Sequence, residues 1–230
     1  MTLEEILMTD TAARLDLVHD DDWDAENCCA YSADGTRLLD AENFPSEVTV
    51  REGCRILCDG VFAFQDYMAG NDHFGEAIPA GERASYLDRI KLPSSVAFIG
   101  KGAFMECGFL RSIRLPKGLV SIGDMAFRDC WELEGISCPA ALLNIGERAF
   151  ENCYSLYNVR LNKGLKRIGP LSFHCCEDLE EIDLPSGIEE IAPDAFDGCI
   201  SLKTIYVPEG AADKFRPLLP KNLFRKVEEF

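Results

Sequence analysis

The 230-residue chain is poor in basic residues and has no long hydrophobic run. Lysine and arginine number 23 against 40 aspartates and glutamates, which gives a formal net charge of −17. A surface this acidic does not attract duplex nucleic acid, whose phosphates must be neutralised by basic side chains, and anionic membranes are disfavoured for the same reason. No stretch approaches the ~20 apolar residues of a membrane-spanning helix. The composition therefore predicts neither a nucleic-acid partner nor insertion into a membrane.

The chain also lacks an export signal and the common catalytic motifs. Its opening residues, MTLEEILMTD, place acids where a signal peptide has a basic segment, and no apolar segment follows. On this basis we expect a cytoplasmic protein, or a secreted or cell-surface one if the native N-terminus is longer. No nucleophile elbow, phosphate-binding loop or dinucleotide fingerprint occurs in the sequence. Neither catalysis nor a cofactor is predicted.

Histidine is scarce, with three copies, and each is poorly placed for a metal site. His19 and His73 have no second ligand at a suitable spacing, although His73 follows Asp72. His174 lies beside Cys175, and this pair offers at most two ligands where structural zinc needs four. We expect no metal centre.

What the chain does contain is a 23-residue repeat. Five near-intact copies follow one another at residues 90–112, 113–135, 136–158, 159–181 and 182–204. They share the pattern I-x-L-P-x-x-L-x-x-I-G-x-x-A-F-x-x-C-x-x-L-x-x. A fixed period of this length is typical of stacked-repeat architectures, in which each unit buries its apolar side chains against its neighbours.

Each part of the repeat predicts a local structure. The I-x-L step alternates between inward and outward side chains and predicts a short strand, which the following proline ends because it has no N–H group. The glycine marks a bend, and the A-F-x-x-C-x-x-L segment places its apolar residues on one side, as a short helical turn does. We therefore expect a parallel sheet along one face and stacked columns of Phe, Leu and Cys.

The eleven cysteines do not have the pattern of a disulfide scaffold. Five of them take the same position in consecutive repeats: Cys107, Cys130, Cys153, Cys176 and Cys199. Free cysteine behaves as a small buried apolar residue, and an odd total suits a reducing compartment. We expect structural thiols, with bridges between adjacent positions of this column as the alternative.

The repeat resembles the BspA-like leucine-rich repeats that are common in bacterial surface proteins. The match covers most of the span from Phe44 to Val207, and the stretch Y-S-A-D-G-T-R-L-L at 31–39 is similar to one through which such chains enter the solenoid. The resemblance implies a β-dominated α/β repeat solenoid, a right-handed leucine-rich-repeat superhelix. It also implies binding, by adhesion or protein–protein contact, and brings no catalytic residues.

Three regions are expected along the chain. Residues 1–47 are an acidic N-terminal segment with a hairpin cap, since Asp34-Gly35 is a strong hairpin-turn signal. Residues 48–208 are the solenoid, and 209–230 are a C-terminal cap. The first repeat is degenerate and carries an insertion at about residues 63–84; inserted loops of this kind frequently carry function.

The outward strand positions form the candidate partner-binding surface, together with the insertion. They run from basic, through small and polar, to acidic and aromatic, and the candidates are Arg89, Lys91, Arg114, Arg160, Asp183 and Tyr206, with Asp72 and His73 in the insertion. Basic side chains gathered on one surface of an acidic protein suit an acidic partner. Two alternatives are that the acidic N-terminal segment lies there, or that charged residues only keep the face solvated.

The sequence thus predicts a non-enzymatic protein-interaction module that binds a protein partner through the sheet face, the 63–84 insertion, or both. A bacterial cell-surface adhesin is the alternative with the same fold. A metal-binding or enzymatic protein that acts through the inserted loop is the remaining hypothesis.

Overall fold

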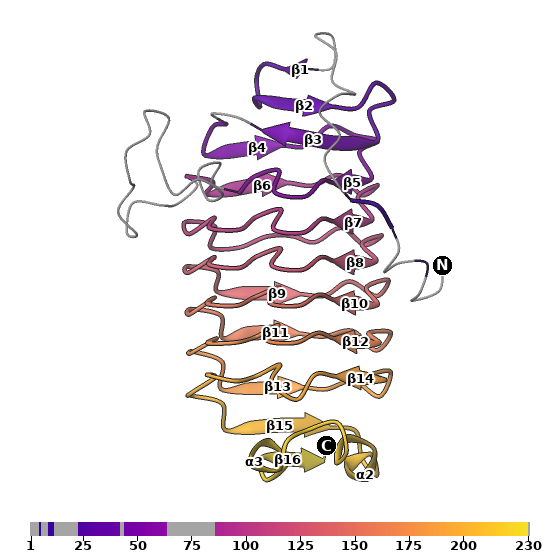
Figure 1. Cartoon of the computed structure of the whole chain (residues 1–230), viewed down its shortest axis with the longest axis vertical. Helices are drawn as coiled ribbons and strands as arrows, with labels where there is room; N and C mark the ends of the chain where they lie inside the picture. Colours follow the sequence, from indigo (N-terminus) through magenta and orange to yellow (C-terminus); the bar gives the residue numbers. More distant parts are fainter. Residues whose placement is uncertain (1–4, 6–8, 12–22, 42–43, 64–85, 230) are drawn as a thin grey trace.

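The computed structural model describes residues 5, 9–11, 23–41, 44–63 and 86–229. The repeats stack in chain order along the long axis of the molecule, and each turn of the stack lies directly on the one before it (Figure 1). The fold is a β-solenoid with little helix, as the period predicts. None of the described helices has the length and apolar character that crossing a membrane requires.

Strands of the I-x-L segments pair in parallel on one side of the stack. These strands are β4 (Glu47–Thr49), β6 (Arg89–Lys91), β9 (Gly135–Ser137), β11 (Asn158–Arg160), β13 (Glu181–Asp183), β15 (Thr204–Val207) and β16 (Val227–Glu229). Their pairing keeps one register, so that Val159 lies beside Ile136 and Ile205 beside Ile182. At Ile113 the segment makes only an isolated bridge, from Ser112 to Gly135. The predicted parallel strands are confirmed.

A second parallel ladder, which the sequence analysis did not predict, runs along another side of the stack. It is formed by the L-x-x-I-G segments and continues three antiparallel N-terminal strands, so that the sheet has nine strands. In order these are β1 (Trp23–Asp24), β2 (Cys29–Tyr31), β3 (Arg37–Ala41), β5 (Ile56–Leu57), β7 (Phe98–Ile99), β8 (Ser121–Ile122), β10 (Asn144–Ile145), β12 (Arg167–Ile168) and β14 (Glu190–Ile191). Each repeat therefore contributes two strand segments rather than one.

The repeat needs a glycine at this position because the backbones of consecutive turns come very close to each other there. A Cβ atom at Gly146 would lie 2.6 Å from the backbone nitrogen of Asp124, and one at Gly123 would lie 2.7 Å from the carbonyl carbon of Gly100. Real Cβ atoms essentially never come within 3.0 Å of another residue's backbone. The glycine therefore lets neighbouring repeats pack without a side chain between them.

The A-F-x-x-C segments are not helical, which corrects the expectation of short helical turns. Residues 86–210 contain no helix. Instead, Glu106, Asp129 and Asn152 take left-handed conformations with φ near 60°, and the N–H groups of Glu106 and Asp129 donate to carbonyls of the next repeat at 2.8 Å. A helical turn would keep these N–H groups within its own repeat, whereas here they link one repeat to the next.

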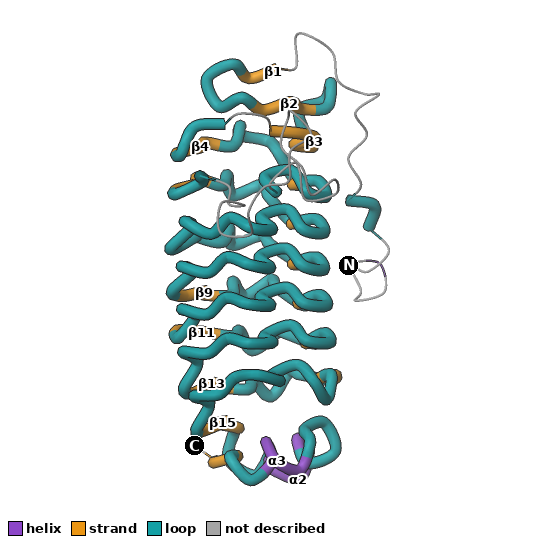
Figure 2. Tube along the Cα trace, turned by 60° about the vertical axis from the view of Figure 1, so that its left-hand side comes forward, coloured by secondary structure: helices purple, strands orange, loops and turns teal. Residues whose placement is uncertain are grey.

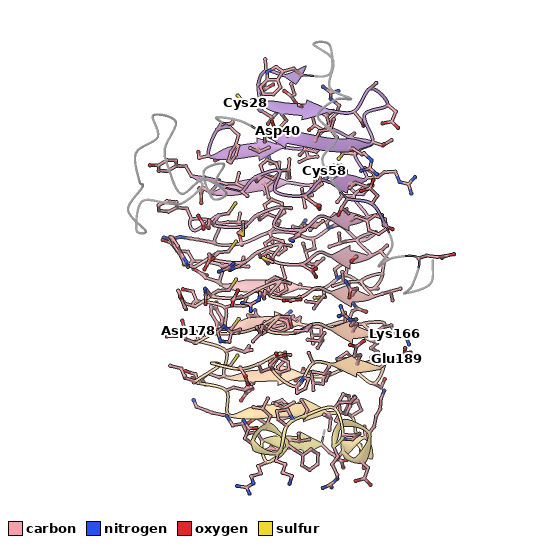
Figure 3. All side chains as sticks on the ribbon, viewed as in Figure 1. Cys28, Asp40, Cys58, Lys166, Asp178 and Glu189 are labelled. Carbon is pink, nitrogen blue, oxygen red and sulfur yellow. The ribbon has the colours of Figure 1, made fainter. Side chains whose placement is uncertain are left out.

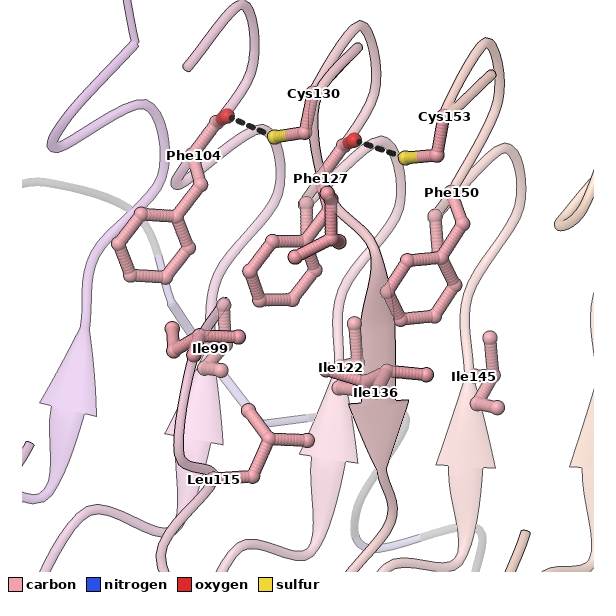
Figure 4. Packing of buried hydrophobic residues seen from close by; sticks show 14 of the residues in the cluster. Ile99, Phe104, Leu115, Ile122, Phe127, Cys130, Ile136, Ile145, Phe150 and Cys153 are labelled. Carbon is pink, nitrogen blue, oxygen red and sulfur yellow. Dashed lines mark hydrogen bonds between the residues drawn. The ribbon is translucent and has the colours of Figure 1, made fainter. Parts of the chain in front are cut away.

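The core is a set of stacked columns, as the repeat predicts (Figure 4). Successive rings of the phenylalanine column, Phe104, Phe127, Phe150 and Phe173, lie 5.0–5.3 Å apart and within 13° of parallel. Phe62 and Phe196 extend the column at its two ends. This column lies inside the stack, where it can be formed only by contact between repeats.

The cysteine column has a specific hydrogen-bonding role. Cys130 Sγ donates to the carbonyl oxygen of Phe104, and Cys153 Sγ donates to that of Phe127, each at 3.1 Å (Figure 4). Burial raises the pKa of Cys130 and of Cys153, so both stay protonated and able to donate. All the cysteines are free thiols, which agrees with structural thiols rather than bridges.

Short helices follow the last repeat, and their apolar side chains join its core. They are α2 (Ala212–Phe215) and α3 (Lys221–Phe224), seen below β15 in Figure 2. Phe215, Leu219 and Leu223 are buried in the same cluster as the repeat columns. After them, β16 pairs in parallel with β15.

Candidate protein-binding face

The I-x-L strands present an open row of side chains to solvent, which we call the short-strand face. It consists of the exposed residues that flank the buried Ile or Val of each strand, and of the residue two positions before that Ile or Val. Strands β6, β11 and β13 each have a buried central residue between two exposed ones. Because the strands pair in register, equivalent positions of successive repeats form straight columns along the stack.

Charge changes sign along one column of the short-strand face, the column formed by the residue that follows each buried Ile or Val. Lys91 and Arg114 are exposed in the earlier repeats and Arg160 near the middle, whereas Asp183 is exposed further along. The face then ends at Glu228 and Glu229 of β16, which are also exposed. The structure therefore places the predicted basic and acidic candidates on one surface, separated along the stack axis.

Two of the predicted candidates make contacts of their own. Arg89 forms ion pairs with Glu47 at 2.8 Å and Asp88 at 3.4 Å, yet 69% of its side chain is exposed. Ion pairs this exposed contribute only ~0–1 kcal/mol, so a partner's carboxylate can replace them at small cost. Tyr206 is half-buried and lies beside Asp183 in the register of β13 and β15.

The remaining two candidates, Asp72 and His73, lie outside the described residues, as does the predicted 63–84 insertion apart from Ala63.

Exposed apolar side chains also lie along one edge of the short-strand face, and Tyr157 belongs to both; the repeat pattern did not predict them. This set, called here the aromatic corner, comprises Tyr86, Phe109, Tyr154, Tyr157 and Ile200. Tyr157 and Ile200 are 56% and 76% exposed, and the rings of Tyr86 and Phe109 stack at 5.9 Å. Most of these residues occupy variable positions around the last leucine of the repeat, so their aromatic content is the signal that could have found them. Large exposed apolar side chains gathered in one place typically mark an interaction site.

Two shallow grooves lie along this corner. One has a volume of about 520 Å³ and is lined by Tyr86, Phe109 and Arg111, among others. The other, of about 600 Å³, combines Tyr157 with Asp178, Glu180 and Glu181. Asp178 lies at the edge of the stack opposite to the ion pair of Lys166 and Glu189 (Figure 3). The grooves therefore open on the same side of the molecule as the short-strand face.

Elsewhere, a buried charged cluster is made of ion pairs within the chain. Glu151 is 5% exposed and meets Arg128 at 2.9 Å and Arg148 at 2.7 Å. His174 Nδ1 lies 3.4 Å from the same carboxylate, and its Nε2 lies 3.6 Å from Cys175 Sγ. Within the described part of the chain, no group of three or more His, Cys, Asp or Glu side chains is placed to hold a metal ion. This cluster links three repeats to one another.

Comparison with known families decides what this repeat is. The model of the BspA type leucine rich repeat region matches residues 82–213 in six copies, which is more than half of the chain. The chain belongs to the BspA-type leucine-rich repeat family. The curated protein sequences contain no match to the chain.

Solved structures of leucine-rich repeat proteins share the fold of this family member. A leucine-rich repeat protein of T. pallidum is 25% identical, with a TM-score of 0.62 over 94% of this chain and 98% of that one. The pneumococcal vaccine antigen PcpA is 18% identical, with a TM-score of 0.64 over 89% of this chain and 48% of that one. A leucine-rich repeat protein from Eubacterium ventriosum is 23% identical, with a TM-score of 0.52 over 77% of this chain and 50% of that one.

Proposed function

We propose that this BspA-type repeat protein is a non-catalytic protein-interaction module and that the short-strand face is its binding surface. The observation that carries the proposal is the coincidence of exposed charge and exposed aromatic residues on one side of the stack. Arg114 and Arg160 lie in the same column of this face, and Tyr157 lies at the opposite edge of the face on the same turn as Arg160. Protein interfaces are enriched in arginine and aromatic residues.

The core supports the same proposal because the columns that stabilise the stack lie inside it and not on the short-strand face. Phenylalanine and cysteine columns hold the repeats together from inside, and the second sheet pairs the repeats along another side. Side chains at the exposed positions of β6, β11 and β13 can therefore vary without affecting the fold, and repeat proteins use such surfaces for binding.

Charge reversal on the face tests the proposal. We expect an Arg114→Glu/Arg160→Glu variant to capture protein partners from the lysate and culture medium of the source organism at least ~10-fold less efficiently than the wild type, since each reversed charge opposes an acidic partner. Thermal unfolding should be almost unchanged, because both side chains are exposed. A deletion of residues 64–85, compared in the same experiment, measures what the insertion contributes.

A matched control has the same change of net charge on another side of the stack. Lys101→Glu/Lys166→Glu places two acids outside the short-strand face, with Lys166 at the opposite edge in Figure 3. This variant should retain wild-type capture. If the Arg114→Glu/Arg160→Glu variant captures the same partners as the wild type, the face is not the binding surface and the proposal is wrong.

A further inference from the structure

We propose that the short-strand face pairs with the same face of a second copy of this chain, with the two stacks antiparallel. The inference rests on the proposed function and names the partner. It follows from the order of charges along the face, with Arg111 and Arg114 on either side of Ile113, and Glu180 and Asp183 at the equivalent positions three strand levels later. A surface with this order of charges is complementary to itself when one copy is reversed.

The repeat geometry determines which residues would meet. In a face-to-face pair of antiparallel stacks, the two-fold axis runs along the strand direction, so every column of side chains faces the same column of the other copy. Placing the axis midway between β9 and β11 uses the whole length of the face. It sets β9 against β11, the 113 repeat against β13, β6 against β15, and β4 against β16. Each contact then occurs twice because of the symmetry.

This arrangement brings opposite charges together at four positions. The facing pairs are Arg114 with Asp183, Arg111 with Glu180, Asp88 with Lys203, and Glu47 with Lys226. Several of these side chains already form exposed ion pairs within the chain, Arg111 with Glu132 at 2.9 Å, Lys203 with Glu180 at 2.8 Å, and Arg89 with Glu47 and Asp88. Ion pairs this exposed are exchanged at small cost. Lys91 faces the ring of Tyr206, which is a favourable pairing of a cation with an aromatic face. None of the facing positions, all of which belong to described residues, pairs two charges of the same sign.

Moving the two-fold axis toward the C-terminal repeats brings like charges together. With the axis on β11 itself, Arg160 would face its own copy. With the axis midway between β11 and β13, Arg111 would face Arg225, and fewer repeats would overlap. Like charges placed opposite each other suppress a wrong register, so the sequence of this face favours one pairing.

The face has the size of a weak, reversible interface. Eight strand levels at ~4.8 Å each and four residue positions at ~3.3 Å each give on the order of 500 Å² per copy, below the ~800 Å² of a standard interface. Tyr157, 56% exposed, lies next to the axis, where it faces Glu134 and comes near the Tyr157 of the second copy. Tyrosine residues are enriched among the hot spots of protein interfaces.

The experiment is a charge swap followed by sedimentation or light scattering at 0.15 M salt, where charges beyond ~8 Å are screened but facing pairs are not. We expect the wild type to dimerise as its concentration rises. The variants Arg111→Glu/Arg114→Glu and Glu180→Lys/Asp183→Lys should each dimerise at least ~10-fold more weakly. An equimolar mixture of the two variants should form a heterodimer, because each change restores the charge pair that the other removes.

The controls separate this inference from the function on which it rests. Circular dichroism should show both variants folded, and Lys101→Glu/Lys166→Glu should dimerise like the wild type. The inference is overturned if the wild type stays monomeric up to its solubility limit, if either variant or the control departs from these expectations, or if the mixture does not associate. A monomeric wild type leaves the capture of a different protein, tested above, unaffected.

Discussion

Removing one ring from the phenylalanine column is the most direct test of what stabilises the solenoid. Phe150 has no exposed surface, and its ring stacks on Phe127 and on Phe173, each at 5.3 Å. Replacing a buried phenylalanine by alanine costs ~3–5 kcal/mol. Because Phe150→Ala also interrupts two ring contacts of ~0.5–1.5 kcal/mol each, we expect a loss near the upper end of that range.

The end of the column offers a comparison within the same fold. Phe196 is 3% exposed and, among the described rings, stacks only on Phe173, at 5.5 Å. Phe196→Ala should therefore destabilise by ~1 kcal/mol less than Phe150→Ala, which is the value of one ring contact. Phe150→Leu keeps most of the apolar volume and removes only the stacking, so its cost should be ~1–3 kcal/mol.

Urea unfolding followed by circular dichroism measures all three variants. With a slope of ~2–3 kcal/mol per molar urea, a loss of about 5 kcal/mol from Phe150→Ala lowers the midpoint of urea unfolding by ~2 M. The reasoning is refuted if Phe150→Ala costs less than ~1.5 kcal/mol, or if Phe196→Ala costs as much as Phe150→Ala. Either result would mean that the continuous column is not the stabilising unit.

Two further predictions concern the glycine and cysteine positions. Gly146→Ala should lower the free energy of unfolding by ~1–3 kcal/mol, because the new Cβ would lie 2.6 Å from the backbone of Asp124. Gly118→Ala should cost less, because its Cβ would lie 3.2 Å from the nearest atom. Equal melting temperatures of the two variants would contradict this prediction. Alkylation of the native protein, read by mass spectrometry, should modify partly exposed Cys28 first and should reach buried Cys130 and Cys153 only on unfolding. If Cys130 and Cys153 of the native protein were alkylated as fast as those of the unfolded protein, the cysteine column would not be packed.

The residue pattern within one repeat gave a wrong or incomplete prediction where a short segment can form more than one structure. The A-F-x-x-C spacing is compatible with a helical turn, but residues such as Asp129 adopt left-handed φ values and direct their N–H groups to the next repeat. Likewise, a two-residue strand such as Asn144–Ile145 has too few residues to show alternation, so the second sheet was missed. In both cases the hydrogen-bond partner belongs to a neighbouring repeat, which local periodicity does not contain.

A 23-residue period is enough to predict the stacking and the content of the columns, because it brings equivalent positions together in every turn. The phenylalanine and cysteine columns follow from it, as does the placement of Arg114, Arg160 and Asp183 on one face. The period does not reveal that each repeat forms two strand segments, or that Tyr157 and Ile200 are exposed at the edge of that face. Exposure and strand pairing depend on the distance between turns, which is set by contacts between repeats and not by the order of residues within one.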